Sequence, residues 1–269
     1  MESCLNSCRL TRARRFLLHG DRRKHARVHH QLLPVDAAQV AALAAPVGPH
    51  AWPGLAELAP VQMRPLPDGL APIQPVPSAH PARRALLERC CDALIACEAA
   101  LNQLDAKSGD GDTGTTLATA ARALKAALDR LPLADPTQLY RAISTELSQT
   151  MGGSSGVLLA IFFAAAGDAS ASGKSWIGAL SAGLDRVMQV GGAEPGHRTL
   201  IDALAPALAA LPQGLAAAAT AARQGADSTA QMTRAKAGRA SYLSPDKLAG
   251  FNDPGAEGVA RLMETLSKG

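Results

Sequence analysis

Three aspartates lie in one glycine-rich stretch, residues 104–116, whose sequence is LDAKSGDGDTGTT. They are Asp105, Asp110 and Asp112, and Gly109 and Gly111 between them allow the backbone to fold back so that the carboxylates converge. Bare carboxylates this close would repel one another. Clustered hard oxygen ligands suit Mg²⁺, which takes one or two carboxylates per ion together with water and phosphate oxygens. We therefore predict that all three aspartates are metal ligands.

Two other interpretations of this stretch are weaker. A solvated Asp/Gly turn with a helix cap explains any single aspartate, but it does not explain three beside a threonine-rich helix start. A calcium-binding EF-hand loop counted from Asp110 places Gly114 at its fifth position and Ala121 at its twelfth. The bidentate acid of such a loop is therefore missing.

Two predicted helix starts are suited to binding phosphate. The first N–H groups of a helix have no intrahelical partner and carry the positive end of its dipole. One start is the DTGTT that follows the aspartates, and the other is MGGSSG at 151–156, where serines precede an apolar helix. Serine caps alone explain the second start equally well. Both starts together with the aspartates favour a metal–phosphate site.

The elements that must position these residues are predicted to be helices. Hydrophobic residues make up 47% of the chain but aromatics only 3%, so the core must come from Ala, Leu, Val and Ile. Apolar residues recur at helical spacing, without strand alternation or a fixed repeat. No apolar run reaches the roughly 18 residues of a membrane span. We expect an all-α fold of about eight helices with antiparallel neighbours, near 81–104, 117–128, 135–150, 154–167, 175–190, 198–211, 213–235 and 254–268.

The N-terminal part differs from the rest. Residues 1–30 are basic and are predicted to be disordered, and residues 31–80 are proline-rich and are predicted to be a linker. The net charge of +4 is concentrated in 9–30, so the remaining chain is slightly acidic and does not favour nucleic-acid binding. The five cysteines fit neither a zinc site nor a disulfide framework, which indicates reduced thiols and a cytoplasmic location.

Five separated motifs resemble the nucleotide-binding DhaL domain of dihydroxyacetone kinases. They are LDAKSGDGDTGTT, MGGSSG, AEPGHRTLIDAL, AGRASYL and DPGA, in this order, and the resemblance covers about 82–268. It implies an eight-helix antiparallel barrel over 81–269, with ATP or ADP in its polar mouth. Two Mg²⁺ ions would bridge the aspartates and the phosphates.

The resemblance also implies which residues contact the nucleotide. They are Thr113, Gly114, Thr115, Thr116, Ser154, Ser155, Gly191, Leu200, Arg239, Asp253, Pro254 and Gly255. Core packing is an equally good explanation for Leu200, and His197 is expected only to face solvent. No catalytic side chain is assigned here, because substrate and general base would come from another domain.

That other domain is the substrate-binding DhaK domain, whose last stretch is similar to 31–54. The resemblance therefore implies an N-terminally truncated kinase that phosphorylates dihydroxyacetone to glycerone phosphate only with a DhaK partner. A homodimer would form through that missing domain. Two alternatives remain: a phosphotransferase-type subunit with bound ADP, or a non-catalytic nucleotide-binding remnant. Thr113 stands where the phosphotransferase-type subunits have histidine, which favours free ATP as the donor.

Overall fold

The computed structural model describes residues 16–17, 30–31, 36–45 and 75–268. The chain divides into two compact units, Met1–Ala71 and Pro72–Gly269, and each is described by itself. The disordered segment predicted over 1–30 and the linker predicted over 31–80 fall largely outside the described residues, as does the similarity to a DhaK domain over 31–54.

The described residues of the first unit form two short strands and one helix. Strand β1 (Phe16–Leu17) pairs antiparallel with β2 (His30–Gln31). Helix α1 (Ala37–Ala44) starts with a capping box, in which Gln39 N donates to Asp36 Oδ1 at 2.8 Å and Asp36 N donates to Gln39 Oε1 at 2.9 Å. These two bonds satisfy donors that a helix start leaves free, so a short helix forms in a stretch that was predicted to be linker.

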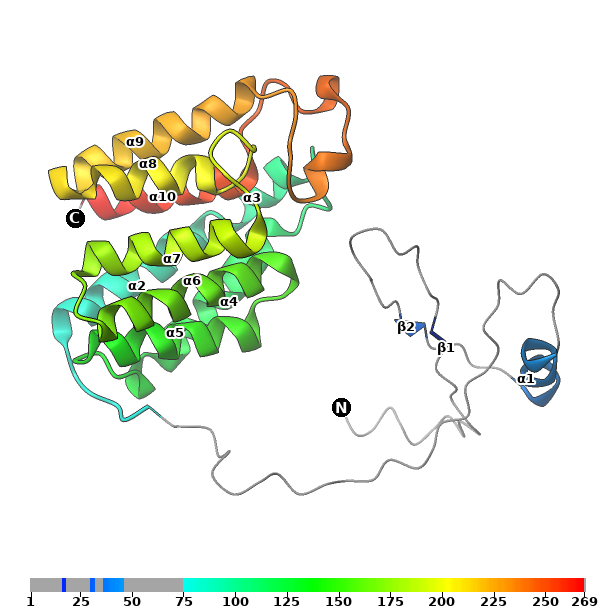
Figure 1. Cartoon of the computed structure of the whole chain (residues 1–269), viewed down its shortest axis with the longest axis horizontal. Helices are drawn as coiled ribbons and strands as arrows, with labels where there is room; N and C mark the ends of the chain where they lie inside the picture. The colour runs from blue at the N-terminus through cyan, green and yellow to red at the C-terminus, as the bar shows by residue number, and fades with distance from the viewer. Residues whose placement is uncertain (1–15, 18–29, 32–35, 46–74, 269) are drawn as a thin grey trace. The chain divides into compact units, whose positions relative to one another are not determined.

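The elements of the second unit, in its described part, are all helices apart from an isolated bridge between Ser78 and Pro132, so the all-α prediction is confirmed (Figure 1). In the described part of this unit the α-helices are α2 (Pro81–Ala96), α3 (Glu98–Asp105), α4 (Thr113–Ala127), α5 (Pro136–Thr150), α6 (Gly153–Ala171), α7 (Trp176–Gly191), α8 (Ile201–Ala210), α9 (Leu215–Ser228) and α10 (Pro254–Ser267). The first of the eight expected helices is divided at Cys97 into α2 and α3. Helices α2, α5 and α10 each begin with proline after a side-chain cap, which suits the first helical turn.

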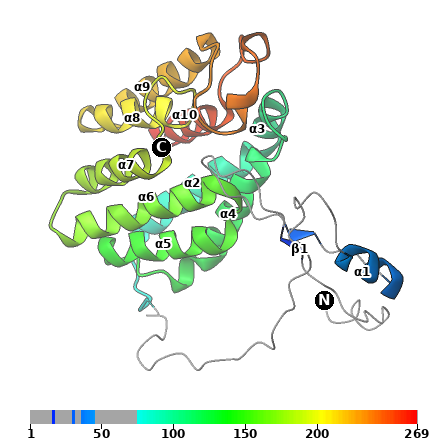
Figure 2. The same cartoon turned by 45° about the vertical axis from the view of Figure 1, so that its right-hand side comes forward.

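The helices of this unit pack in chain order. Helix α2 contacts α4, and contacts then follow from α4 to α5, α6, α7, α8, α9 and α10, after which α10 returns to α2. Both views show α7 between α6 and α8 (Figure 2). One core cluster lies along α7–α10 and includes Ile201, Ala222 and Ala260, and another lies along α4–α6 and includes Leu124 and Ile143.

Small residues let these helices approach closely. A Cβ on Gly225 in α9 would lie 2.1 Å from the carbonyl oxygen of Asp202 in α8, so only glycine fits there. Alanines 207, 218 and 222 of the same two helices are fully buried. The aromatic-poor composition therefore produces tight helix–helix packing in place of a core of large side chains.

We expected no segment that is both apolar enough and long enough to cross a membrane, but helix α6 is one. It meets that length and composition test, because Val157–Phe163 and the alanines after it raise the mean hydropathy of its 18-residue window to 1.4. One such helix is weak evidence, since the core helix of a soluble protein passes the same test. Here α6 packs along both α5 and α7.

From α4 onward, successive α-helices run in opposite directions, so the starts of α4, α6, α8 and α10 lie at one end of the unit, on the right in Figure 1. The segments that precede these four starts are 106–112, 151–152, 192–200 and 229–253. This end therefore collects all five sequence motifs.

Candidate functional site

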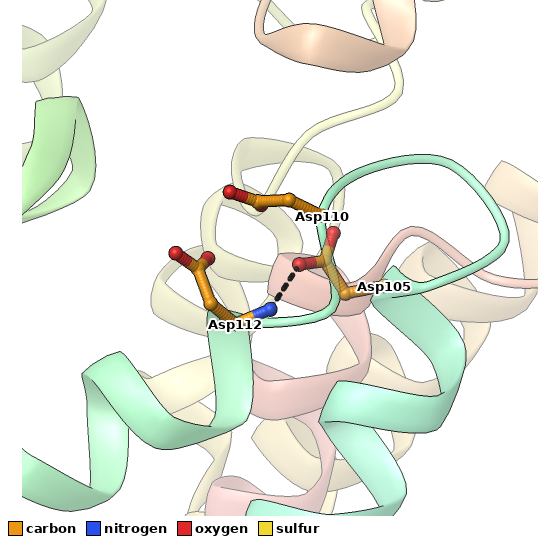
Figure 3. Close-up of side chains that lie close together, drawn as sticks. All are labelled: Asp105, Asp110 and Asp112. Carbon is orange, nitrogen blue, oxygen red and sulfur yellow. Dashed lines mark hydrogen bonds between the residues drawn. The ribbon is translucent and has the colours of Figure 1, made fainter.

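The three predicted metal ligands come together in the loop between α3 and α4. Asp105, Asp110 and Asp112 each offer a carboxylate oxygen, and these oxygens lie within 4.8 Å of one another. Asp105 is buried, whereas Asp110 and Asp112 are exposed. Figure 3 shows Asp110 and Asp112 projecting toward the same side of the loop, with Asp105 to their right. This donor set and spacing fit a hard divalent cation.

Asp105 owes its position to the backbone around it. Its Oδ2 accepts hydrogen bonds from Asp112 N at 3.0 Å and Thr113 N at 3.1 Å, the first of which is dashed in Figure 3. A Cβ at Gly109 would lie 2.3 Å from Asp105 Oδ1, and Gly111 adopts φ +78. The two glycines thus make the turn possible and leave room for the carboxylate.

Helix α4 starts at this loop, but most of its first N–H groups are already bonded. Besides Thr113 N, Thr115 N donates to Asn102 Oδ1 at 2.9 Å and Thr116 N donates to the carbonyl oxygen of Asp112 at 2.9 Å. Asn102 Nδ2 also donates to Thr115 Oγ1 at 2.8 Å. Asn102 is a supporting residue that sequence reasoning missed. Any contact of α4 with phosphate would therefore fall chiefly to the hydroxyls of Thr113 and Thr116.

The start of α6 is freer than that of α4. Its cap is Gly152, no side chain caps it, and Gly153 adopts φ +72. Ser154 is exposed and Ser155 is partly buried. Gly191, at the end of α7, lies against Leu158, where a Cβ would approach to 3.2 Å. The structure thus brings predicted contact residues of α6 and α7 side by side, while no hydrogen bond joins Ser154 or Ser155 to the aspartate loop within 75–268.

Arg239 reaches the aspartate loop from far along the chain. It begins a single 3-10 turn (Arg239–Tyr242), and its Nη1 forms an ion pair with Asp110 Oδ2. The guanidinium offsets part of the negative charge of the aspartate cluster. The contact joins the predicted nucleotide contact Arg239 to a predicted metal ligand.

The starts of α8 and α10 also meet. A Cβ on Gly255 would lie 3.1 Å from Leu200 Cβ and 3.1 Å from Asp253 Oδ1, so Leu200 packs directly on the Asp253-Pro254-Gly255 turn. Asp253 caps α10 by accepting from Ala256 N at 2.9 Å. Burial raises the pKa of Asp253 to about 6.

The loop before α8 contains residues whose roles the sequence did not reveal. Arg198 is 1% exposed and adopts φ 58. Burial lowers its pKa, opposed by the charge of Asp253. Buried Asp202 accepts from Thr199 N at 2.7 Å and from Gly196 N, which holds the loop in place.

The expectation that His197 only faces solvent is wrong. It is partly buried, its Nδ1 accepts from Glu194 N at 3.1 Å, and its Nε2 lies 3.2 Å from Lys236 Nζ. Lys236 is 39 residues away in the sequence, so only the fold reveals this contact.

Comparisons with known proteins identify the family to which this geometry corresponds. The DAK2 domain family matches residues 107–268. Dihydroxyacetone kinase of Citrobacter freundii is 46% identical over 197 residues, which are 71% of this chain and 36% of the relative. The triokinase/FMN cyclase of Homo sapiens is 36% identical over 259 residues, which are 87% of this chain and 44% of the relative. The chain thus spans less than half the length of either relative.

Solved structures are similar as well. The native crystal structure of the dihydroxyacetone kinase of C. freundii matches with a TM-score of 0.68 at 36% identity, covering 88% of this chain and 43% of that one. The same kinase in complex with AMP-PNP and Mg²⁺ matches with a TM-score of 0.66 at 34% identity.

Proposed function

The chain belongs to the DAK2 domain family, and on that premise we propose that it binds ATP with magnesium as the nucleotide-binding half of a dihydroxyacetone (glycerone) kinase. The observation that carries the proposal is the group of three carboxylates within 4.8 Å at the end of the unit where α4, α6, α8 and α10 start. The AMP-PNP and Mg²⁺ in the similar kinase structure support it.

The residues present fit magnesium. Asp112 is the cap residue of α4, yet its side chain makes no capping bond, so its carboxylate is free for a ligand. Asp105 uses Oδ2 for backbone donors and keeps Oδ1. Bound Mg²⁺ would neutralise phosphate charge during transfer. We propose two such ions, held by the three aspartates.

The chain's own groups would then hold the nucleotide around the metal. The start of α6, with Ser154 and Ser155, offers N–H and hydroxyl donors to phosphate oxygens. Arg239 forms an ion pair with Asp110 and would supply positive charge beside the phosphates. On the other side, Gly191, Leu200 and the Asp253–Gly255 turn would contact the nucleoside. Catalysis of phosphoryl transfer is mostly positioning and charge stabilisation, so no acid or base is assigned.

The acceptor is proposed to be dihydroxyacetone, presented by a DhaK substrate domain. The names of the relatives support this substrate, since they are dihydroxyacetone kinases and triokinases. A cytoplasmic location and dimer formation through the substrate domain remain predictions.

Calorimetric titration of the full chain with ATP, with and without Mg²⁺, tests the proposal. We expect binding that requires Mg²⁺ and falls at least tenfold in Asp112→Asn, because the variant removes one negative charge from the metal site. Asp168→Asn is the matched control, since Asp168 is exposed in an ion pair with Arg141 near the other end of α6. Equal affinity of all three proteins would contradict the metal assignment.

The same titration separates the alternatives. ADP that survives purification and is not displaced by ATP would indicate the phosphotransferase-type subunit. Exchange of free ATP, as Thr113 favours, indicates the ATP-dependent branch. Binding without turnover in the presence of a DhaK domain would indicate a non-catalytic remnant.

A further inference from the structure

Arg198 is held in a conformation that is costly in two respects. Its φ of 58 is the single positive value found for a non-glycine residue among the described residues. Its side chain is almost fully buried, and Nε and Nη1 have no hydrogen-bond partner in the described part of the chain. A left-handed backbone and unpaired buried donors both disfavour folding. We therefore expect a residue with these two unfavourable features to be present for a functional reason, which its contacts indicate.

The contacts of Arg198 show what it connects. Its Nη2 donates to the carbonyl oxygens of Leu248 and Phe251, each at 3.0 Å, and its guanidinium lies 4.9 Å from the centre of the Phe251 ring. Arg198 therefore joins the loop before α8 to the segment before α10. These partners are 50 and 53 residues away in the sequence.

Both ends of this connection lead directly to proposed nucleotide contacts. Leu200 follows Arg198 by two positions, and Asp253 follows Phe251 by two. Leu200 in turn packs on Gly255. The Arg198 side chain thus sets the spacing between the start of α8 and the start of α10.

We propose that Arg198 is a positioning residue, which holds Leu200 and the Asp253–Gly255 turn at the separation that accepts the nucleoside part of ATP. The inference rests on the proposed function, but it assigns a task that none of the predicted nucleotide contacts performs. Because Arg198 itself is buried beneath Phe251, it acts through these neighbours and not by touching the phosphates. Its loss should weaken recognition of the nucleoside and leave binding of the phosphate chain intact.

Two ligands separate these effects. ATP engages both sides of the site, whereas inorganic tripolyphosphate with Mg²⁺ engages only the aspartates and the phosphate contacts. We expect Arg198→Lys to reduce the affinity for ATP at least tenfold and to change the affinity for tripolyphosphate less than twofold. Lysine keeps the charge but cannot donate from one planar group to two carbonyls while lying on a ring.

A second variant covers the case in which Arg198→Lys does not fold. Phe251→Leu leaves the Phe251 carbonyl in place and removes the ring on which the guanidinium rests and which Lys107 Nζ approaches to 5.4 Å, so we expect a smaller loss of ATP affinity in the same direction. Leu139→Ala is the stability control, because it opens the buried core of α5 near the other end of the unit and should leave the ratio of the two affinities unchanged.

The outcomes are distinct. A parallel loss of ATP and tripolyphosphate binding in Arg198→Lys, or an unchanged ratio in both site variants, would overturn the positioning role. A wild-type chain that binds neither ligand would contradict the proposed function itself, and the role of Arg198 with it.

Discussion

The carboxylate of Asp253 both caps α10 and is buried, and these two conditions have opposite effects on its pKa. It caps α10 through Ala256 N and its own N–H donates to Thr229 Oγ1 at 2.8 Å, so the turn needs an oxygen acceptor at this position. Burial meanwhile disfavours its charged form and raises its pKa from 3.8 to about 6. The burial of this helix cap therefore makes the free energy of unfolding depend on pH.

The first prediction follows from that pKa. Because the folded value lies above the unfolded one, this group stabilises the fold most below about pH 4, and the contribution is lost as the pH rises to about 6. The shift corresponds to at most about 3 kcal/mol. The free energy of unfolding of the wild type, measured in urea, should therefore fall between pH 4 and 6. This fall should be absent in Asp253→Asn, which keeps a good cap. An unchanged pH profile would contradict the buried charge.

Gly114 is the second residue with a testable constraint. A Cβ there would lie 2.0 Å from the carbonyl oxygen of Glu98 and 2.7 Å from Asn102 Oδ1, so Gly114→Ala must push α3 and α4 apart. Overpacking of this kind costs about 1–3 kcal/mol, measurable by denaturant unfolding. Gly152→Ala is the control, since a Cβ at Gly152 meets nothing within 4 Å. Equal stability of the two variants would show that α4 does not approach α3 this closely.

At the scale of elements, α9 and α10 are joined by a buried charge network. Glu257 in α10 accepts hydrogen bonds from Arg223 Nη1 and Arg261 Nε, each at 2.6 Å, and from Asn252 Nδ2 at 2.9 Å. Burial raises the pKa of Glu257, but hydrogen bonds from Arg223, Arg261 and Asn252 outweigh it and lower the pKa to about 2. The network holds the first turn of α10, and with it the Asp253 cap, against α9.

Glu257→Gln should therefore destabilise the chain at neutral pH by about 1–3 kcal/mol, because charged hydrogen bonds are replaced by weaker ones. The folded pKa lies below the unfolded one, so the contribution is present above about pH 5 and is lost as the pH falls toward 2. The difference between wild type and variant in urea unfolding should shrink over that range. Glu88→Gln, in an exposed pair with Arg84, is the control and should change stability little. A constant difference at all pH values would contradict this account.

At the scale of the whole molecule, the proposed chemistry is divided between this unit and a substrate domain. The site end of the unit gathers carboxylates, an arginine and helix starts, all suited to a nucleotide and its metal. The chain spans 36% of the bacterial relative and 44% of the human one. Turnover is thus expected to need residues beyond those described.

The chain by itself should bind MgATP without phosphorylating dihydroxyacetone. Positioning of the acceptor contributes on the order of 7–11 kcal/mol at best in such reactions, so its absence should remove essentially all turnover. Addition of a DhaK domain from a close relative should restore product, measured by an enzyme-coupled NADH assay. Full kinase activity from the isolated chain would show that it carries its own acceptor site. Asp112→Asn with the added domain should stay inactive.

The sequence alone determined the grouping of the three aspartates and the helical class. Asp105, Asp110 and Asp112 lie so near one another along the chain that a glycine turn is enough to bring them together. Helical periodicity in an alanine-rich, aromatic-poor chain indicates an all-α fold, because such small side chains are buried well only between closely packed helices. Both signals are local, so they can be recognised before any folding is considered.

The tertiary structure decided what surrounds the aspartates. The Arg239–Asp110 pair, the contact of Leu200 with Gly255 and the hydrogen bonds of Arg198 each join segments about 50 to 130 residues apart. They exist because α10 returns to α2 and aligns four helix starts at one end. The same packing turned most N–H groups at the start of α4 toward Asp105, Asn102 and Asp112, and left those of α6 without a side-chain cap. Periodicity states which face of a helix is buried, but it does not state which distant residue will meet it.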